Sequence, residues 1–197
     1  PSFKFVPFGR LDKVEEAMSD RTAAIITEPI QGEGGVHIAP EGFLQGLRNL
    51  CDEYGAVLIL DEVQTGLGRT GKMWAFEHWR IIPDVMCVAK AMASGIPVGA
   101  TLAKSEIMDS LQVGEHTTTF GGSPLTCAAA CATIDVIIEE KLVDRARVLG
   151  KFFMDSLLKV KEKVRLVRDI RGLGLMIGVE CRIDIYHILM RCLERGM

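Results

Sequence analysis

AVLILDEVQTGLGRTG, the segment from Ala56 to Gly71, is the part of the sequence from which the fold class can be inferred. It begins with an unbroken apolar run and two carboxylates, which predicts a strand over 56–62 of the kind buried on both faces of a parallel sheet. It ends in GLGRTG, which matches the G-x-G-x-x-G pattern of nucleotide-binding loops. Three kinds of cofactor site are therefore compatible with the segment: a phosphate-loop NTPase site, a dinucleotide site, and a site with an acidic residue at a strand end.

Two nucleotide-binding interpretations are disfavoured by the surrounding residues. A phosphate-loop NTPase pairs its acidic strand end with a G-x-x-x-x-G-K-[ST] loop, which is absent from these 197 residues. A dinucleotide fingerprint needs glycines that follow the strand directly and open a helix. Here DEVQT intervenes and no long apolar helix follows GRTGKM. We therefore interpret GLGRTG as a tightly turning loop that needs positive φ.

The remaining elements alternate between strand and helix patterns. Apolar periodicity, Pro40 as a first-turn residue and Gly55 as a stop predict a helix over 40–55. Further strands are predicted within 21–30, 84–90 and 98–104, with short helical structure at 73–79 and helices at 126–140, 141–163 and 184–195; two strands joined at RGLG are predicted within 164–181. This order predicts an α/β domain over 1–137 followed by a small α+β domain over 138–197.

Lys90 and Asp61 point to a cofactor at the sheet edge. Each follows an apolar strand, and ligands of open α/β sheets bind beyond the carboxyl ends of the strands. A lysine there is an ordinary surface residue unless it serves a purpose, such as attack on a carbonyl by its neutral amine. Asp61 favours the second alternative, because pyridoxal phosphate needs a lysine for its aldehyde and an aspartate for its pyridine nitrogen.

At this point the sequence resembles a known family, the class III pyridoxal-phosphate-dependent aminotransferases. The similarity covers essentially the whole chain. It rests on EPIQGEGGVHIAPEGFLQGLRNLCDEYGAVLILDEVQTGLGRTG, on the lysine strand, on TTTFGGSPLTCAAA and on the 29-residue spacing (90 − 61) between Asp61 and Lys90. It implies a fold type I large domain, with a mainly parallel sheet and helices on both faces, and part of a small C-terminal domain.

The resemblance also implies roles for individual residues. Lys90 would bind the cofactor covalently and then move the substrate proton. Asp61 would pair with the pyridine nitrogen. Val63 would pack on the ring, and Gln64 would bond its phenolic oxygen. Relatives have a glycine-rich run where this chain has AMASGIP after the lysine, which removes no catalytic group.

Other implied roles concern the phosphate and the substrate. Thr119, with Thr118 beside it, would reach the phosphate of the partner subunit's cofactor, which implies a homodimer. Glu33 in QGEGG would line the substrate site and pair with the arginine that holds a substrate carboxylate. Solvated loop positions are the alternative for these residues. Glu28 and Arg69 also match the family motif, and a structural role is at least as plausible for each.

The acetylornithine branch of the family is the most similar, through FVPFGRLDKVEEAM, DEVQTG and RDIRGLGLMIGVE. It implies transfer of the terminal amino group of N2-acetylornithine to 2-oxoglutarate, in arginine biosynthesis. Ornithine, acyl-lysine and 4-aminobutyrate are alternative donors. A dialkylglycine-type decarboxylase on the same scaffold is a more distant alternative.

Composition and charge limit the partners and the compartment that we expect for this protein. A net charge of −3 gives no reason to expect nucleic acid or an anionic membrane as a partner, and no apolar run reaches the roughly 20 residues of a membrane span. Six scattered cysteines without zinc spacing predict buried thiols, no metal site and a cytoplasmic protein. The four histidines show no catalytic spacing. The start at Pro1 suggests a fragment. The resemblance implies an upstream glycine-rich phosphate loop, a stacking aromatic and a substrate-carboxylate arginine that are not in these residues, so we expect the isolated chain to bind the cofactor poorly.

Overall fold

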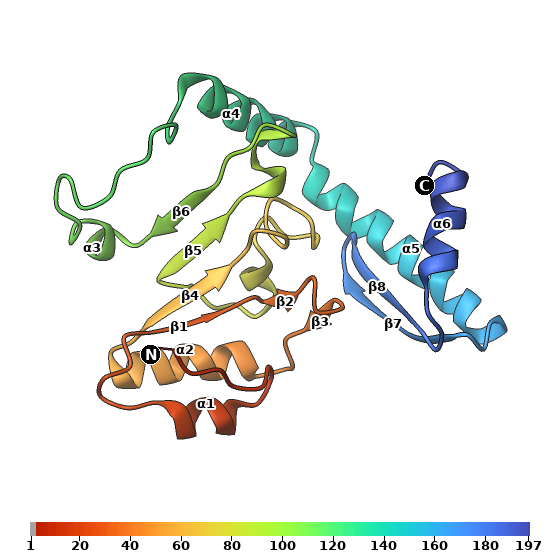
Figure 1. Cartoon of the computed structure of the whole chain (residues 1–197), viewed down its shortest axis with the longest axis horizontal. Helices are drawn as coiled ribbons and strands as arrows, with labels where there is room; N and C mark the ends of the chain where they lie inside the picture. Colours follow the sequence, from red (N-terminus) through yellow and green to blue (C-terminus); the bar gives the residue numbers. More distant parts are fainter. Residues whose placement is uncertain (1–2) are drawn as a thin grey trace.

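A four-stranded sheet forms the centre of the chain in the computed structural model, which describes residues 3–197 (Figure 1). The strand order is β1–β4–β5–β6. Strands β1 (Ala24–Thr27), β4 (Val57–Asp61) and β5 (Val85–Val88) are parallel, and β6 (Ala100–Ala103) runs antiparallel at the edge. The predicted α/β class and mainly parallel sheet are therefore confirmed. Parallel pairing brings the carboxyl ends of β4 and β5 to the same edge.

Helix α2 (Phe43–Tyr54) contacts β1 and β4 and covers one face of the sheet. Its apolar stripe buries Leu44 and Leu47 completely, and these side chains join Leu58 and Leu60 of β4 in the main core. Fully burying one such side chain stabilises the fold by about 1.5–3 kcal/mol. The apolar stripe of α2 therefore meets the face of β4 that carries Leu58 and Leu60, since side chains alternate between the two faces of a strand.

The C-terminal end of α2 agrees with the sequence prediction, but its N-terminal end does not. Gly55 ends the helix as expected, in the left-handed conformation at φ 66°. Pro40 does not occupy the first turn, because Gly42 at φ 76° forms the N-terminal boundary. Helix α1 (Leu11–Ala17) was not predicted, and it packs against α2.

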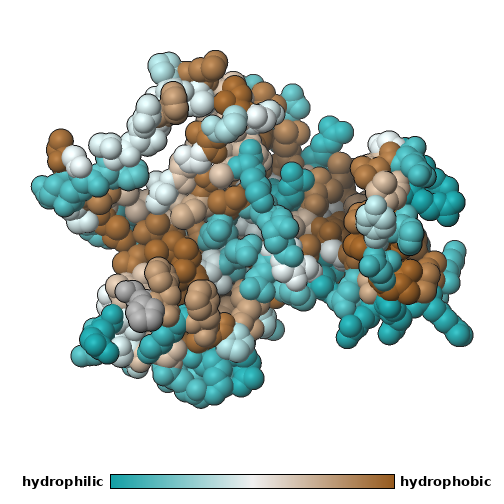
Figure 2. All heavy atoms as spheres, in the orientation of Figure 1, coloured by the Kyte–Doolittle hydropathy of each residue, from teal (hydrophilic) through white to brown (hydrophobic). Residues whose placement is uncertain are grey.

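The second face of the sheet is more open than the sequence predicted. Burial alternates along β4, so that Val57 and Ile59 are only half-buried. Ile26 of β1, which pairs with Ile59, is 61% exposed. Figure 2 shows hydrophobic residues gathered where the strands lie in Figure 1. Burial of β4 on both faces is therefore wrong for this chain, because α2 covers only the face of Leu58 and Leu60.

A buried carboxylate ties the sheet to its surroundings. Asp84, just before β5, accepts hydrogen bonds from Arg48 Nη1 of α2 at 2.7 Å, from Lys104 Nζ at 2.6 Å and from the Leu58 backbone N–H at 2.7 Å. Burial alone would raise the pKa of Asp84, but these partners outweigh it and hold that pKa below its ordinary value of 3.8. One side chain thus joins α2, β4 and the β6 edge.

The C-terminal part has the predicted helix–hairpin–helix order. After α3 (Ser105–Met108) and a long loop come α4 (Pro124–Glu139), α5 (Leu142–Lys163), β7 (Val167–Leu173), β8 (Met176–Cys181) and α6 (Tyr186–Glu194), as Figure 1 shows. Ser123 and Pro124 start α4 in the usual way, since the Ser123 hydroxyl accepts the Thr126 N–H and proline suits the first turn. The hairpin turns at Gly174 and Leu175, because β7 continues to Leu173.

The GLGRTG loop packs against this hairpin and against α5. The Leu175 N–H donates to the Arg69 carbonyl at 2.9 Å. A methyl group on Gly174 would overlap the backbone of Thr70, and one on Gly71 would come within 2.9 Å of Arg147 Cβ. Gly71 also has φ 84°. These glycines permit close backbone packing, which agrees with the turn interpretation of the motif.

The cysteine prediction was wrong in part. Cys51 is buried, but Cys127 and Cys131 of α4 are exposed, because α4 presents that side to solvent in this chain. The residues that the structure describes form no disulfide. Within residues 3–197, the helices are too short or too polar to cross a membrane.

Candidate active site

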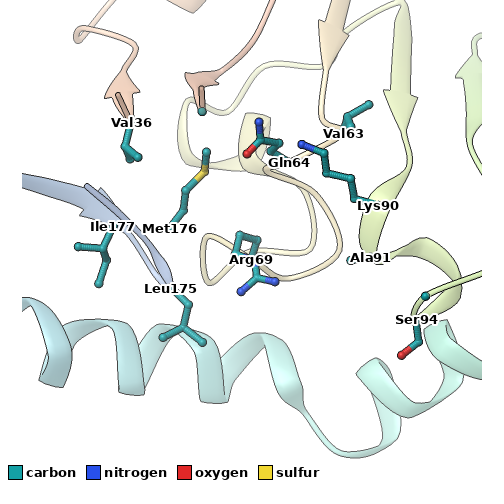
Figure 3. A pocket seen from close by; sticks show the side chains of 12 residues that line it. Val36, Val63, Gln64, Arg69, Lys90, Ala91, Ser94, Leu175, Met176 and Ile177 are labelled. Carbon is teal, nitrogen blue, oxygen red and sulfur yellow. The ribbon is translucent and has the colours of Figure 1, made fainter. Parts of the chain in front are cut away.

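A cavity of about 470 Å³ lies beyond the carboxyl ends of β4 and β5 (Figure 3). One wall is the DEVQTG turn with Val63 and Gln64, and another is the segment that starts at Lys90. The opposite wall is the β7–β8 hairpin, which contributes Leu175, Met176 and Ile177. Val36 and Arg69 also line the cavity. Sequence reasoning did not place the hairpin in the site, because no residue pattern in RGLGLMIG indicates a ligand.

Lys90 is the first residue of the short helix η2 (Lys90–Ala93), not the last residue of a strand as predicted. Strand β5 ends two residues earlier, at Val88. Lys90 adopts φ 43°, a conformation that costs free energy for a residue other than glycine and that is typical of functional sites. Its side chain is exposed and points into the cavity toward Gln64 (Figure 3).

Asp61 ends β4 and pairs in register with Cys87 of β5. Its Oδ1 accepts the Val63 N–H at 2.9 Å, which closes the turn after the strand. Among the described residues, Oδ2 has no hydrogen-bond partner. Asp61 does not line the cavity itself, but Val63 and Gln64 of the same turn do. An aspartate with one oxygen committed and one available suits a protonated ring nitrogen. Asp61 and Lys90 therefore follow adjacent strands at one edge, as the sequence predicted.

Gln64 and Glu33 are brought together. Gln64 Nε2 donates to Glu33 Oε1 at 3.3 Å, across from the loop between β2 (Ile30–Gln31) and β3 (His37–Ile38). Gly32 leaves room for the amide, since a Cβ there would lie 2.7 Å from it. Glu28 holds this loop by accepting the Gly32 N–H at 3.0 Å, a structural role that the sequence left open.

Glu62 is the residue that sequence reasoning missed. It is 1% exposed and points away from the cavity, with Thr65 beside it. Its carboxylate accepts the Thr65 hydroxyl, the Ala75 N–H at 3.0 Å and the Phe76 N–H at 2.9 Å. Burial raises the pKa of Glu62 above its usual value. The adjacent pair Asp61–Glu62 was a usable signal, because successive residues leaving a strand point to opposite sides.

Thr118 and Thr119 are not brought to this cavity. Both lie on the exposed loop between α3 and α4, and neither lines the pocket. His78 does not line the cavity either, and its Nε2 pairs with the Thr70 hydroxyl at 3.0 Å. Of the predicted site residues, Lys90, Val63 and Gln64 therefore line one cavity, whereas the threonine pair stands apart.

Comparison with known proteins identifies the family. Residues 8–197 match the family described as aminotransferase class-III. The chain belongs to the class-III aminotransferases. Pyridoxal phosphate is the cofactor of this family.

Individual relatives agree with the family assignment. The acetylornithine aminotransferase of Methanocaldococcus jannaschii is 47% identical over 100% of this chain and 49% of its own length. That of Methanothermobacter thermautotrophicus is 51% identical over 99% of the chain and 50% of its own length. An ornithine aminotransferase structure from Toxoplasma gondii, described with partial occupancy of pyridoxal phosphate at its active site, matches with a TM-score of 0.96. It is 39% identical, over 100% of this chain and 47% of that one.

The chain spans about half the length of the curated relatives that it matches. The residues present nonetheless fit the family's cofactor. The cavity holds a lysine on one wall, and Asp61 keeps one carboxylate oxygen free of partners within residues 3–197. The absence of a Cβ at Gly32 keeps Gln64 in place beside the lysine.

Proposed function

We propose that the full-length protein transfers the terminal amino group of N2-acetylornithine to 2-oxoglutarate with pyridoxal phosphate as cofactor. The observation that carries the proposal is the meeting of Lys90 and the DEVQTG turn at one cavity, beyond adjacent parallel strands. The donor is suggested by acetylornithine aminotransferases at 47% and 51% identity. The pathway would be arginine biosynthesis, and the place of action the cytoplasm.

The residues of this chain would divide the work. Bound pyridoxal phosphate supplies an electron sink for the bond broken at the substrate carbon. Lys90 would bind the cofactor, and its released amine would move the proton between the substrate carbon and C4′ of the cofactor. Asp61 would keep the ring nitrogen protonated by its negative charge. Val63 would pack on the cofactor ring, and Gln64 would donate to its phenolic oxygen. Glu33 would line the substrate site and pair with the arginine that holds a substrate carboxylate.

Homodimerisation is part of the proposal. Thr118 and Thr119 are exposed and lie away from the cavity of their own chain, which supports a role at a second subunit's cofactor phosphate. We also propose that 1–137 belongs to the cofactor-binding large domain and 138–197 to the small domain. The division is supported by the helix–hairpin–helix unit of α5, β7, β8 and α6, which begins after α4 ends at Glu139, two residues beyond the proposed boundary.

Ornithine is the second candidate donor. The Toxoplasma gondii ornithine aminotransferase matches the whole chain with a TM-score of 0.96, so the backbone of this half suits either donor. Acyl-lysine and 4-aminobutyrate remain less supported alternatives, as does dialkylglycine decarboxylation.

An absorbance experiment on the full-length protein tests the proposal. Protein mixed with pyridoxal phosphate is expected to show the band of a lysine-bound cofactor, which acetylornithine converts to the pyridoxamine form. A band that responds only to ornithine would transfer the proposal to the second donor. Absence of the band in folded protein would overturn the cofactor assignment, and Lys90→Ala is the control for the lysine.

A further inference from the structure

A buried carboxylate behind the cofactor turn has no role in the proposed chemistry. Glu62 follows Asp61 directly, yet its side chain lies on the opposite side of the turn and does not line the cavity. Only 1% of Glu62 is exposed, and Thr65 next to it is fully buried. A carboxylate in such a place is costly unless its hydrogen bonds are satisfied.

Glu62 satisfies its carboxylate with donors from two segments. The Thr65 hydroxyl comes from the same turn. The Ala75 and Phe76 N–H groups, at 3.0 and 2.9 Å, come from the start of the short helix η1 (Ala75–His78). The side chain thereby joins the turn after β4 to a segment more than ten residues further along the chain.

The backbone of Glu62 makes further connections. Its N–H donates to the Cys87 carbonyl of β5 at 2.9 Å, and its carbonyl accepts the Gly66 N–H at 2.9 Å. The turn therefore has two sides. Val63 and Gln64 line the cavity, and Asp61 holds the Val63 N–H, while Glu62 and Thr65 anchor the same five residues from behind.

We propose that Glu62 is a positioning residue for the cofactor, which holds Asp61, Val63 and Gln64 in place by clamping the turn to η1. This inference rests on the proposed pyridoxal-phosphate function of the cavity. Glu62 itself touches neither cofactor nor substrate. Its effect would pass through the turn, because a turn without this clamp is free to shift relative to Lys90 on the neighbouring segment.

Glutamine is the sharpest replacement for Glu62. It keeps the shape, but one of its two terminal groups is an NH₂ donor, which cannot accept the Thr65, Ala75 and Phe76 hydrogens together. Groups that orient metal ligands typically change affinity or activity by about 10–100-fold when they are replaced, and we take the same range for a group that orients a cofactor turn. We therefore expect Glu62→Gln to weaken binding of pyridoxal phosphate about 10–100-fold, and to lower kcat with little change in KM for the donor.

Glu77 provides the matched control. Its Oε1 accepts the Trp74 N–H at 2.9 Å at the start of the same short helix, but it makes no bond to the cofactor turn. Glu77→Gln is expected to lower the melting temperature without changing cofactor affinity. Thr65 provides a second test, in which Thr65→Val removes the hydroxyl and Thr65→Ser keeps it.

The experiment uses the full-length protein and measures cofactor affinity by titration, the absorbance spectrum against pH, and thermal unfolding without cofactor. Glu62→Gln and Thr65→Val are expected to shift cofactor affinity and the pH at which the spectrum changes, and Thr65→Ser is expected to restore both. Thr65→Val decides the matter if Glu62→Gln does not fold.

Two results would contradict the inference in different ways. If the unaltered protein binds pyridoxal phosphate and the folded variants bind it equally well, with only a lower melting temperature, Glu62 merely stabilises the fold. If the unaltered folded protein does not bind the cofactor, the proposed function fails and this inference fails with it.

Discussion

The sheet edge at Asp61 and Lys90 and the loop at Thr118 and Thr119 carry two halves of the same predicted site, and they are built differently. The sheet edge rests on the buried core of β4 and α2 and is fixed by hydrogen bonds from behind. Residues 109–122 form a loop that is exposed throughout, including Phe120 at 84%.

The difference teaches which functional residues one chain can place by itself. Pairing of β4 with β5 places Asp61 opposite Cys87, three residues before Lys90, without help from another subunit. No strand or buried anchor fixes the threonine pair within the part of the chain that the structure describes. We infer that the first half of the site is formed by this chain's own fold, while the second half depends on the proposed dimer.

Removal of the Lys90 amine is expected to have the largest effect of any change at the sheet edge. Lys90→Ala is expected to lower turnover of the full-length protein by about 10³-fold or more, since Lys90 is the one lysine among the described residues that line the cavity. Steady-state kinetics and the absorbance spectrum measure this. Lys159→Ala, at an exposed position of α5 outside the cavity, is the comparison, and equal losses in both would contradict the assignment.

Removing the anchor carboxylate tests the stability of the same region. Asp84→Asn is expected to lower the free energy of unfolding by about 3 kcal/mol, because Arg48 would lose a buried partner. Denaturant unfolding measures it. Asp144→Asn, at an exposed ion pair on α5, is the control and is expected to change little.

The same variant has a defined pH dependence. The folded pKa of Asp84 lies below its ordinary value of 3.8, so its stabilisation is complete above pH 3.8 and disappears as the pH falls through the folded pKa. The difference in stability between Asp84→Asn and the unaltered protein should therefore shrink below pH 3.8. A constant difference would contradict the role of the charge.

The loop half should respond more weakly and in another property. Thr119→Val is expected to reduce affinity for pyridoxal phosphate about tenfold, the cost of one hydrogen bond to a charged group, without changing the melting temperature of the cofactor-free protein. Fluorescence titration measures the affinity. Thr117→Val serves as the control, and an equal loss there would remove the special role of Thr119.

The sequence predicts the sheet edge well because its cause is local. An apolar run that ends in Asp61, and a second that leads to Lys90, suffice once the strands are parallel. The sequence placed Pro40 in the first turn of the helix, which was wrong. The helix starts later, because Gly42 adopts the left-handed conformation just before it. The sequence also did not predict the clamp of Glu62, since the donors of Ala75 and Phe76 meet it only after folding.

The central claim is that Lys90 is the residue that binds the cofactor. It is tested most directly by mixing the full-length protein with pyridoxal phosphate, reducing with borohydride and mapping the modified peptide by mass spectrometry. We expect the pyridoxyl group on Lys90 in the peptide that follows β5. Modification of a different lysine, or none in protein shown to be folded, would contradict the account.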